Sequence, residues 1–157
     1  MKTTLLLVGK TVDKHLMALM EDYVERTKHY LSFEVEVIPD LKNNKNLSEE
    51  QQKEKEGELI LKALQPGDHV VLLDEGGKEM RSVEFSQYLR HKMNTLSKRL
   101  VFVIGGPYGF SQKVYQAATE KMSLSRMTFS HQMVRLIFVE QLYRGMSILA
   151  GSPYHHE

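Results

Sequence analysis

The chain has 157 residues, of which 41% are apolar and 26% charged, and its formal net charge is +1. This length suits one domain with a substantial core, so we expect residues 1–157 to fold as a single domain and not to be disordered. No apolar stretch approaches the ~20 residues that cross a bilayer, and the absence of cysteine excludes disulfides and Cys-ligated metal centres. The simplest interpretation is a cytoplasmic protein without a signal peptide.

Charge is unevenly distributed along the chain. Residues 1–97 carry 14 Lys or Arg against 17 Asp or Glu, whereas residues 98–157 carry 7 against 3. The simplest explanation of this asymmetry is that the charged residues lie on solvated helix faces. A more specific explanation is an anionic partner that docks near the C-terminal third.

Strand and helix patterns alternate from the N-terminus. Asp13 can cap the first helix, and the segment from Ser48 to Gln51 has the capping-box pattern that opens the second. Residues 41–47 are rich in Lys and Asn and predict a mobile loop. The elements expected in this half are a strand over 3–8, a helix over 14–28, a strand over 33–38 and a helix over 49–64.

The alternation continues to the C-terminus, where the strands are almost wholly apolar. The elements expected here are a strand over 69–73, a helix that Ser82 can cap, a strand over 100–104, a short helix over 112–118, a brief strand over 121–125 and a long helix over 132–148. Polar glycine loops follow two of these strands, over 74–78 and 105–109. Residues 151–157 are a polar tail, for which a disordered terminus is the plain interpretation.

This alternation predicts an α/β fold with a mainly parallel sheet and helices on both faces. Such sheets bind ligands beyond the carboxyl ends of their strands, which is where both glycine loops fall. The loop over 105–109 lacks the position of a dinucleotide fingerprint and the Gly-Lys-Ser/Thr of a phosphate loop. We therefore expect a pocket for a nucleotide-like ligand other than a conventional NAD or ATP site, with a plain tight turn as the alternative.

Other catalytic chemistry has little support in the sequence. Seven histidines are scattered without metal-ligand spacing, so we expect no bound metal. No Gly-x-Ser-x-Gly elbow is present. Two segments nevertheless resist a plain interpretation: residues 123–131, which combine hydroxyls with bulky apolar side chains, and residues 153–156, whose Tyr and His side chains can stack on exposed bases.

Blocks of sequence spread over the whole chain are similar to one known family. They are Val8-Gly9-Lys10, the Lys-Glu-Lys-Glu-Gly-Glu segment 53–58, Leu73-Asp74, Gly77-Lys78, Val103-Ile104-Gly105-Gly106-Pro107, residues 123–129, Val134-Arg135, Glu140-Gln141-Leu142-Tyr143-Arg144 and Pro153-Tyr154-His155. Each block is weak alone, but their order and spacing are specific. On these residues the chain resembles the RlmH family, SPOUT-type methyltransferases that modify pseudouridine in large-subunit ribosomal RNA.

The resemblance implies a homodimer with a deep trefoil knot near the C-terminus. It also implies S-adenosylmethionine held by three loops, and methyl transfer to N3 of a pseudouridine in 23S rRNA within the assembled ribosome. Carried over by position, the cofactor-binding residues are Leu73, Gly105, Leu124, Ser125, Arg126, Met127, Thr128 and Phe129. Where this chain has Ser130, family members usually have proline, which leaves the shape of the third loop open.

Methyl transfer to N3 also requires that the N3 proton be removed. Histidine is the natural base near neutral pH, and His131 and His155 are the two catalytic candidates, with water or phosphate as alternatives. Arg135, Arg144 and Tyr154 are the candidate RNA-binding residues. Because the chain is short, we expect the tail of one subunit to complete the cofactor pocket of the other.

Two competing functions stay open at this point. One is a non-catalytic ribosome-associated factor that keeps the cofactor fold. Ser130 is the only sequence feature that favours this alternative. The other is a flavodoxin-like module that binds a nucleotide or flavin, against which the missing phosphate loop argues.

Overall fold

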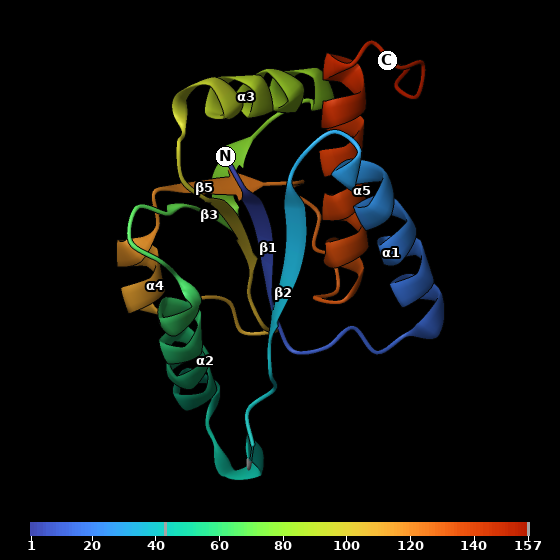
Figure 1. Cartoon of the computed structure of the whole chain (residues 1–157). Helices are drawn as coiled ribbons and strands as arrows, with labels where there is room; N and C mark the ends of the chain where they lie inside the picture. The colour runs from blue at the N-terminus through green and yellow to red at the C-terminus, as the bar shows by residue number, and fades with distance from the viewer. Residues whose placement is uncertain (43, 157) are drawn as a thin grey trace.

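The computed structural model describes residues 1–42 and 44–156 (Figure 1). Strands and helices alternate along the chain, as expected. The elements are β1 (Thr3–Val8), α1 (Lys14–Lys28), β2 (Phe33–Ile38), a 3₁₀ turn (Asn44–Asn46), α2 (Glu49–Ala63), β3 (His69–Glu79), α3 (Ser82–Thr95), β4 (Leu100–Ile104), α4 (Gln112–Ala117), β5 (Glu120–Ser123) and α5 (Met133–Leu149).

The strands form one five-stranded sheet in the order β2-β1-β4-β3-β5, and every neighbouring pair is parallel. All residues of β1 and β4 are buried, because these central strands are covered on both faces. Leu5 in the middle of β1 lies opposite Val35 of β2 and Phe102 of β4. The parallel α/β sheet predicted from the sequence is confirmed.

Helices cover both faces of the sheet, as Figure 1 shows. On one face α1, α3 and α5 pack over a core that includes Leu16, Leu89 and Phe138. On the other face α2 and α4 pack over a smaller core that includes Ile60 and Val114. The chain therefore passes to opposite faces after β3 and after β4, which leaves room for a ligand between their carboxyl ends.

Local sequence signals account for the start of several helices. The Asp13 side chain accepts hydrogen bonds from the backbone N–H groups of His15 (2.8 Å) and Leu16 (3.0 Å), as expected for a cap. Ser48 and Gln51 form the predicted capping box at α2. Ser82, expected as a cap, is instead the first residue of α3, and Arg81 holds the cap position.

One expectation was wrong: β3 does not end at Leu73 in a glycine loop. After an irregular stretch the strand continues, and Lys78 and Glu79 pair with Met122 and Ser123 of β5. Gly77 makes this possible, because a Cβ there would lie 2.5 Å from the backbone nitrogen of Met122. β5 is correspondingly displaced from the expected 121–125 to Glu120–Ser123.

The segment over 41–47, expected as a mobile loop, contains the short 3₁₀ turn Asn44–Asn46. Residue 43 lies outside the described residues, and the mobility of the segment stays a prediction.

Candidate active site

A cavity of about 470 Å³ opens at the carboxyl edge of the sheet. Three segments from neighbouring strands line it: residues 73–75, where the regular pairing of β3 is interrupted, residues 104–110 from the end of β4, and residues 123–129 except Arg126 from the end of β5. His131 and Val134, from the start of the last helix region, complete the lining. Its volume falls within the ~300–1,000 Å³ of small-molecule sites. The cavity therefore lies at the strand ends that the sequence predicts for a ligand.

The second segment is a tight loop built on glycine. A Cβ on Gly105 would lie 2.9 Å from the ring of Phe110, so this position admits no larger side chain without displacing the ring. Gly109 has a φ of +83° and donates its N–H to the carbonyl of Gly106 at 3.2 Å. The three glycines of this loop thus present only main chain to the cavity.

The third segment is held by its own hydroxyl groups. Ser123 Oγ donates to the carbonyl of Ser125 (2.9 Å), and Ser125 Oγ accepts from the N–H of Met127 (3.0 Å). Ser130 Oγ accepts from the N–H of Met133 at 3.0 Å, as a helix-capping hydroxyl does. Ser130 therefore supports the first turn of α5.

The residues that the resemblance implies for cofactor binding mostly meet at this cavity. Those that line it are Leu73, Gly105, Leu124, Ser125, Met127, Thr128 and Phe129. Arg126 does not line it: its side chain is 90% exposed and lies 4.0 Å from Glu79. Of the two candidate bases, His131 lines the cavity and His155 does not.

Asp74 lies at the cavity, and its carboxylate is already hydrogen-bonded within the protein. Asp74 accepts hydrogen bonds from the Tyr115 hydroxyl (2.6 Å) and from the backbone N–H of Gly76 (3.0 Å). Burial, together with the Asp74 carboxylate, raises the pKa of Tyr115 to about 12. Tyr115 therefore stays protonated near neutral pH and donates to Asp74.

The C-terminal tail is docked on α5 and α1, so the described part of it is ordered. The Tyr154 hydroxyl donates to Glu140 Oε1 (3.0 Å), and Arg144 pairs with the same oxygen at 2.6 Å. His155 Nδ1 lies 3.0 Å from a guanidinium nitrogen of Arg144. We call Glu140, Arg144, Tyr154 and His155 the tail cluster. Burial and the hydroxyl of Tyr23 raise the pKa of Tyr154 above its usual value.

Arg135 has a different environment from the one expected of an RNA contact. It is fully buried and donates to the carbonyls of Val8 (2.7 Å) and Gly9 (2.8 Å) and to Thr11 Oγ1 (3.0 Å). Burial lowers the pKa of its guanidinium below the usual value. The prediction that Arg135 meets RNA phosphates does not match this placement, because the group has no surface open to solvent. Its contacts instead attach α5 to the end of β1.

Sequence reasoning did not select Glu140 as a site residue, although it joins the tail cluster. The available signal was its spacing from Arg144, four residues on in one helix, which places the two side chains on the same face.

Comparisons with known proteins agree with this fold. A family model described as "Predicted SPOUT methyltransferase" matches residues 1–155. Proteins named "Ribosomal RNA large subunit methyltransferase H" from Bacteroides thetaiotaomicron and Phocaeicola vulgatus are 71% and 72% identical over 157 residues, covering 100% of each chain. The protein of the same name from Flavobacterium johnsoniae is 59% identical over the same length.

A solved structure supports the fold alone. "The structure of a probable methylase family protein" from Haemophilus influenzae has a TM-score of 0.55 at 9% identity, covering 99% of this chain and 70% of that one.

The chain belongs to the SPOUT methyltransferase family. It is accordingly an enzyme of the class that takes its methyl group from S-adenosylmethionine. The cavity fits that cofactor chemically: apolar side chains of Leu73, Leu124 and Phe129 suit an adenine ring, and the exposed main chain of the glycine loop suits polar groups.

Among residues 1–42 and 44–156, no group of three or more His, Cys, Asp or Glu could hold a metal ion. No helix in the same part of the chain is long and apolar enough to cross a membrane.

Proposed function

We propose that this protein methylates N3 of a pseudouridine in 23S rRNA of the assembled ribosome, and so works in the cytoplasm. The observation that carries the proposal is the convergence of three strand-end segments on one cavity that fits S-adenosylmethionine. The relatives named as large-subunit rRNA methyltransferases, at 71% and 72% identity over the full chain, support the choice of substrate.

In this proposal Leu73, Gly105 and the segment 124–129 hold the cofactor, with Arg126 at the outer edge. The bound cofactor supplies a methyl group that its sulfonium has already activated. The chain must then position the base and remove water from around it. The apolar lining, including Met127 and Phe129, does the second task.

The N3 proton needs an acceptor close to the cavity. His131 lines the cavity, and this favours it over His155 within one chain. His155 belongs to the tail cluster, where Arg144 and Tyr154 offer a cation and an aromatic ring to RNA.

A homodimer would bring the two groups together. Within one chain the described tail does not line the cavity, so a tail can complete only the cavity of a partner. The second copy would cover two exposed apolar side chains, Val12 (75% exposed) and Met133 (46% exposed). The two residues lie near each other, because the N–H of Val12 donates a hydrogen bond to the side chain of Gln132, the residue before Met133.

We also propose that residues 1–157 form one domain with the C-terminal trefoil knot implied by the family. Support comes from the SPOUT methyltransferase family model, which matches residues 1–155 and so includes the C-terminal region where the family carries its knot.

The test is transfer of labelled methyl from S-adenosylmethionine to ribosomes that lack the modification, with free 23S rRNA measured alongside. Label on ribosomes that maps to N3 of a pseudouridine is the expected result. No label on either substrate, with cofactor binding intact, would contradict the proposal and favour the non-catalytic ribosome-associated factor.

Shared sites are tested by mixing subunits. A protomer without residues 151–157 is combined with a protomer that carries a substitution at Gly105. Activity that reappears in the mixed dimer is expected, and its absence would show that the tail does not act across the dimer.

A further inference from the structure

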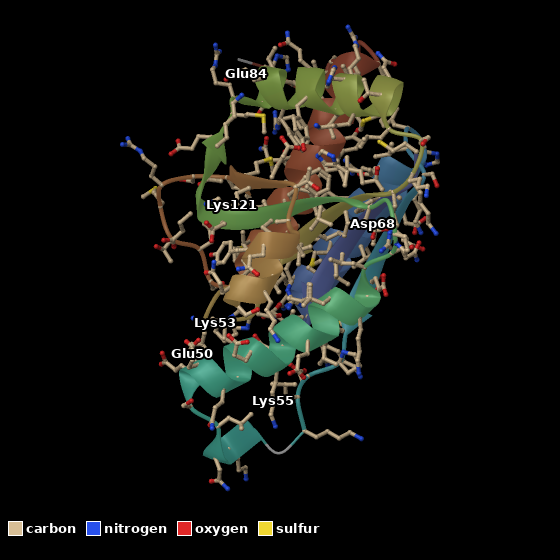
Figure 2. All side chains as sticks on the ribbon, turned by 90° about the vertical axis from the view of Figure 1, so that its left-hand side faces the viewer. Glu50, Lys53, Lys55, Asp68, Glu84 and Lys121 are labelled. Atoms are coloured by element: carbon tan, nitrogen blue, oxygen red, sulfur yellow. The ribbon has the colours of Figure 1, made fainter. Side chains whose placement is uncertain are left out.

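Glu56 is a buried acidic residue on a helix whose other charged side chains are exposed or half-buried. Figure 2 shows Glu50 and Lys55 on the outer side of α2, and both are exposed. Glu56 by contrast is 5% exposed and faces inward. An ionisable side chain is rarely buried to this degree without a partner, so its surroundings need an explanation.

The Glu56 carboxyl lies directly behind the glycine loop of the cavity. A Cβ on Gly106 would lie 2.6 Å from Oε1 and 2.8 Å from Oε2 of Glu56, so the carboxyl group occupies the space of the missing side chain. The next residue, Gly57, packs in the same close manner against Ser111, which caps α4. Two consecutive residues of α2 thus contact the loop near both of its ends.

The loop is therefore a thin wall between the cavity and α2. Residues 105–110 line the cavity on one side, and Glu56 touches Gly106 from the helix side. Any movement of the carboxyl group shifts the main chain that forms the cavity wall, because close-packed interiors transmit displacement.

The hydrogen bonding of Glu56 is incomplete. Oε2 accepts from Gln52 Nε2 at 3.2 Å, whereas Oε1 is buried and has no hydrogen-bond partner. Such a group is costly to bury when it is charged. Burial raises the pKa of Glu56, the Gln52 hydrogen bond lowers it, and the nearby Asp40 carboxylate raises it. If Glu56 only filled space, an apolar side chain would do so with a smaller desolvation cost.

We propose that Glu56 is a positioning residue for S-adenosylmethionine binding, which holds the main chain of Gly106 in place from behind the cavity wall. The inference rests on the cofactor site of the proposed function and is independent of the RNA substrate. Glu56 does not line the cavity and is not a catalytic residue.

Binding of S-adenosylhomocysteine to the full-length protein, measured by calorimetry, tests the proposal without RNA. Glu56→Ala removes the support and is expected to weaken binding by about tenfold, since small misplacements of a site cost ~10–100-fold. Glu56→Gln keeps the shape and is expected to stay within about twofold of the original protein. Equal binding by Glu56→Ala and the original protein would overturn the proposal.

Ile60→Val is the matched control, because Ile60 lies on the same helix, is 2% exposed and does not line the cavity. It is expected to lower thermal stability and leave S-adenosylhomocysteine affinity unchanged. If Ile60→Val weakens binding as much as Glu56→Ala, the effect is general loss of stability and the proposal is wrong.

The pH dependence of the Gly106 amide resonance gives a second readout, which a general loss of packing would not reproduce. The chemical shift is expected to change with pH in the original protein and to stay constant in Glu56→Gln. A resonance that does not titrate, or titrates alike in both proteins, would overturn the proposal. Wild-type protein that binds S-adenosylhomocysteine yet labels no ribosome would instead contradict the proposed substrate and leave this inference standing.

Discussion

Tyr23 in α1 and Tyr154 in the C-terminal tail share a hydrogen bond of 3.0 Å between their hydroxyl oxygens, across 131 residues of sequence. Tyr154 also stacks edge-on against Tyr143 of α5, with ring centroids 4.8 Å apart. These contacts fix a segment that would otherwise fray as a chain terminus. The described part of the tail is therefore held in one defined position against α1 and α5.

Removing one hydroxyl should loosen this attachment. Tyr23→Phe is expected to lower the free energy of unfolding by about 1 kcal/mol, the net value of one hydrogen bond. It should lower methylation more than S-adenosylhomocysteine affinity, because the tail does not line the cavity of its own chain. Denaturant unfolding and calorimetry measure the two effects, and equal losses in both would contradict the expectation.

Gly77 should tolerate no side chain. Gly77→Ala places a methyl group 2.5–2.6 Å from the backbone of Lys121 and Met122, so the β3 extension and β5 must separate. We expect a loss of at least ~2 kcal/mol in stability and weaker S-adenosylhomocysteine binding, since β5 leads into the third cavity segment. Gly76→Ala is the control, because the nearest atom to its Cβ is the terminal carboxylate oxygen of Asp74 at 3.1 Å. Thermal unfolding of both variants decides the matter.

Arg135 should prove structural. Arg135→Met keeps the volume but leaves the carbonyls of Val8 and Gly9 without this donor, which costs about 1–3 kcal/mol. The salt dependence of ribosome binding should not change. Arg144→Met, by contrast, should reduce the slope of log affinity against log salt by about one. A smaller slope in the Arg135 variant would restore it as a phosphate contact.

The stability of the protein should depend on pH through Glu56. Its pKa is raised in the folded state, so the folded protein binds the proton more tightly than the unfolded chain. The associated stability is present below the unfolded value of about 4.3 and is lost as pH rises through the raised pKa. Glu56→Gln lacks this loss, so its stability relative to the original protein should be greater at about pH 7.5, above the unfolded value of about 4.3, than at about pH 3.5, below it. Urea denaturation at the two pH values measures the difference, and the opposite sign would show that the carboxylate is stabilised in the fold.

His131 should affect chemistry more than cofactor binding. His131→Ala is expected to lower single-turnover methylation by about 100-fold, the lower end for loss of a general base, with S-adenosylhomocysteine affinity changed only slightly. His155→Ala on the tail serves as the comparison. If only the His155 variant loses turnover, the acceptor belongs to the tail cluster and not to the cavity wall.

Local patterns in the sequence determined most of the elements. The bounds of β1 and β4 follow from buried, largely apolar runs that end at Gly9 and Gly105, and those of β2 follow from an alternation of apolar residues with Glu that Pro39 ends. The capping groups of Asp13 and Ser48 set the start of two helices, because a cap acts on its own first turn. The parallel sheet and the two cavity segments after Leu73 and after Ile104 follow from the same alternation, and the third segment from the family resemblance.

Long-range contacts decided the rest. The extension of β3 depends on pairing with β5, more than 40 residues later in the chain, as its register shows. The burial of Arg135 depends on carbonyls 126 and 127 residues away, and a charged residue on a helix gives no local sign of such partners. In the sequence Glu56 is one of several acidic residues in a charged helix, and only its packing against Gly106 in the folded chain distinguishes it from the others. Sequence alone determines what each residue prefers locally, whereas only the packed chain decides which polar groups lose their water and must find partners within the protein.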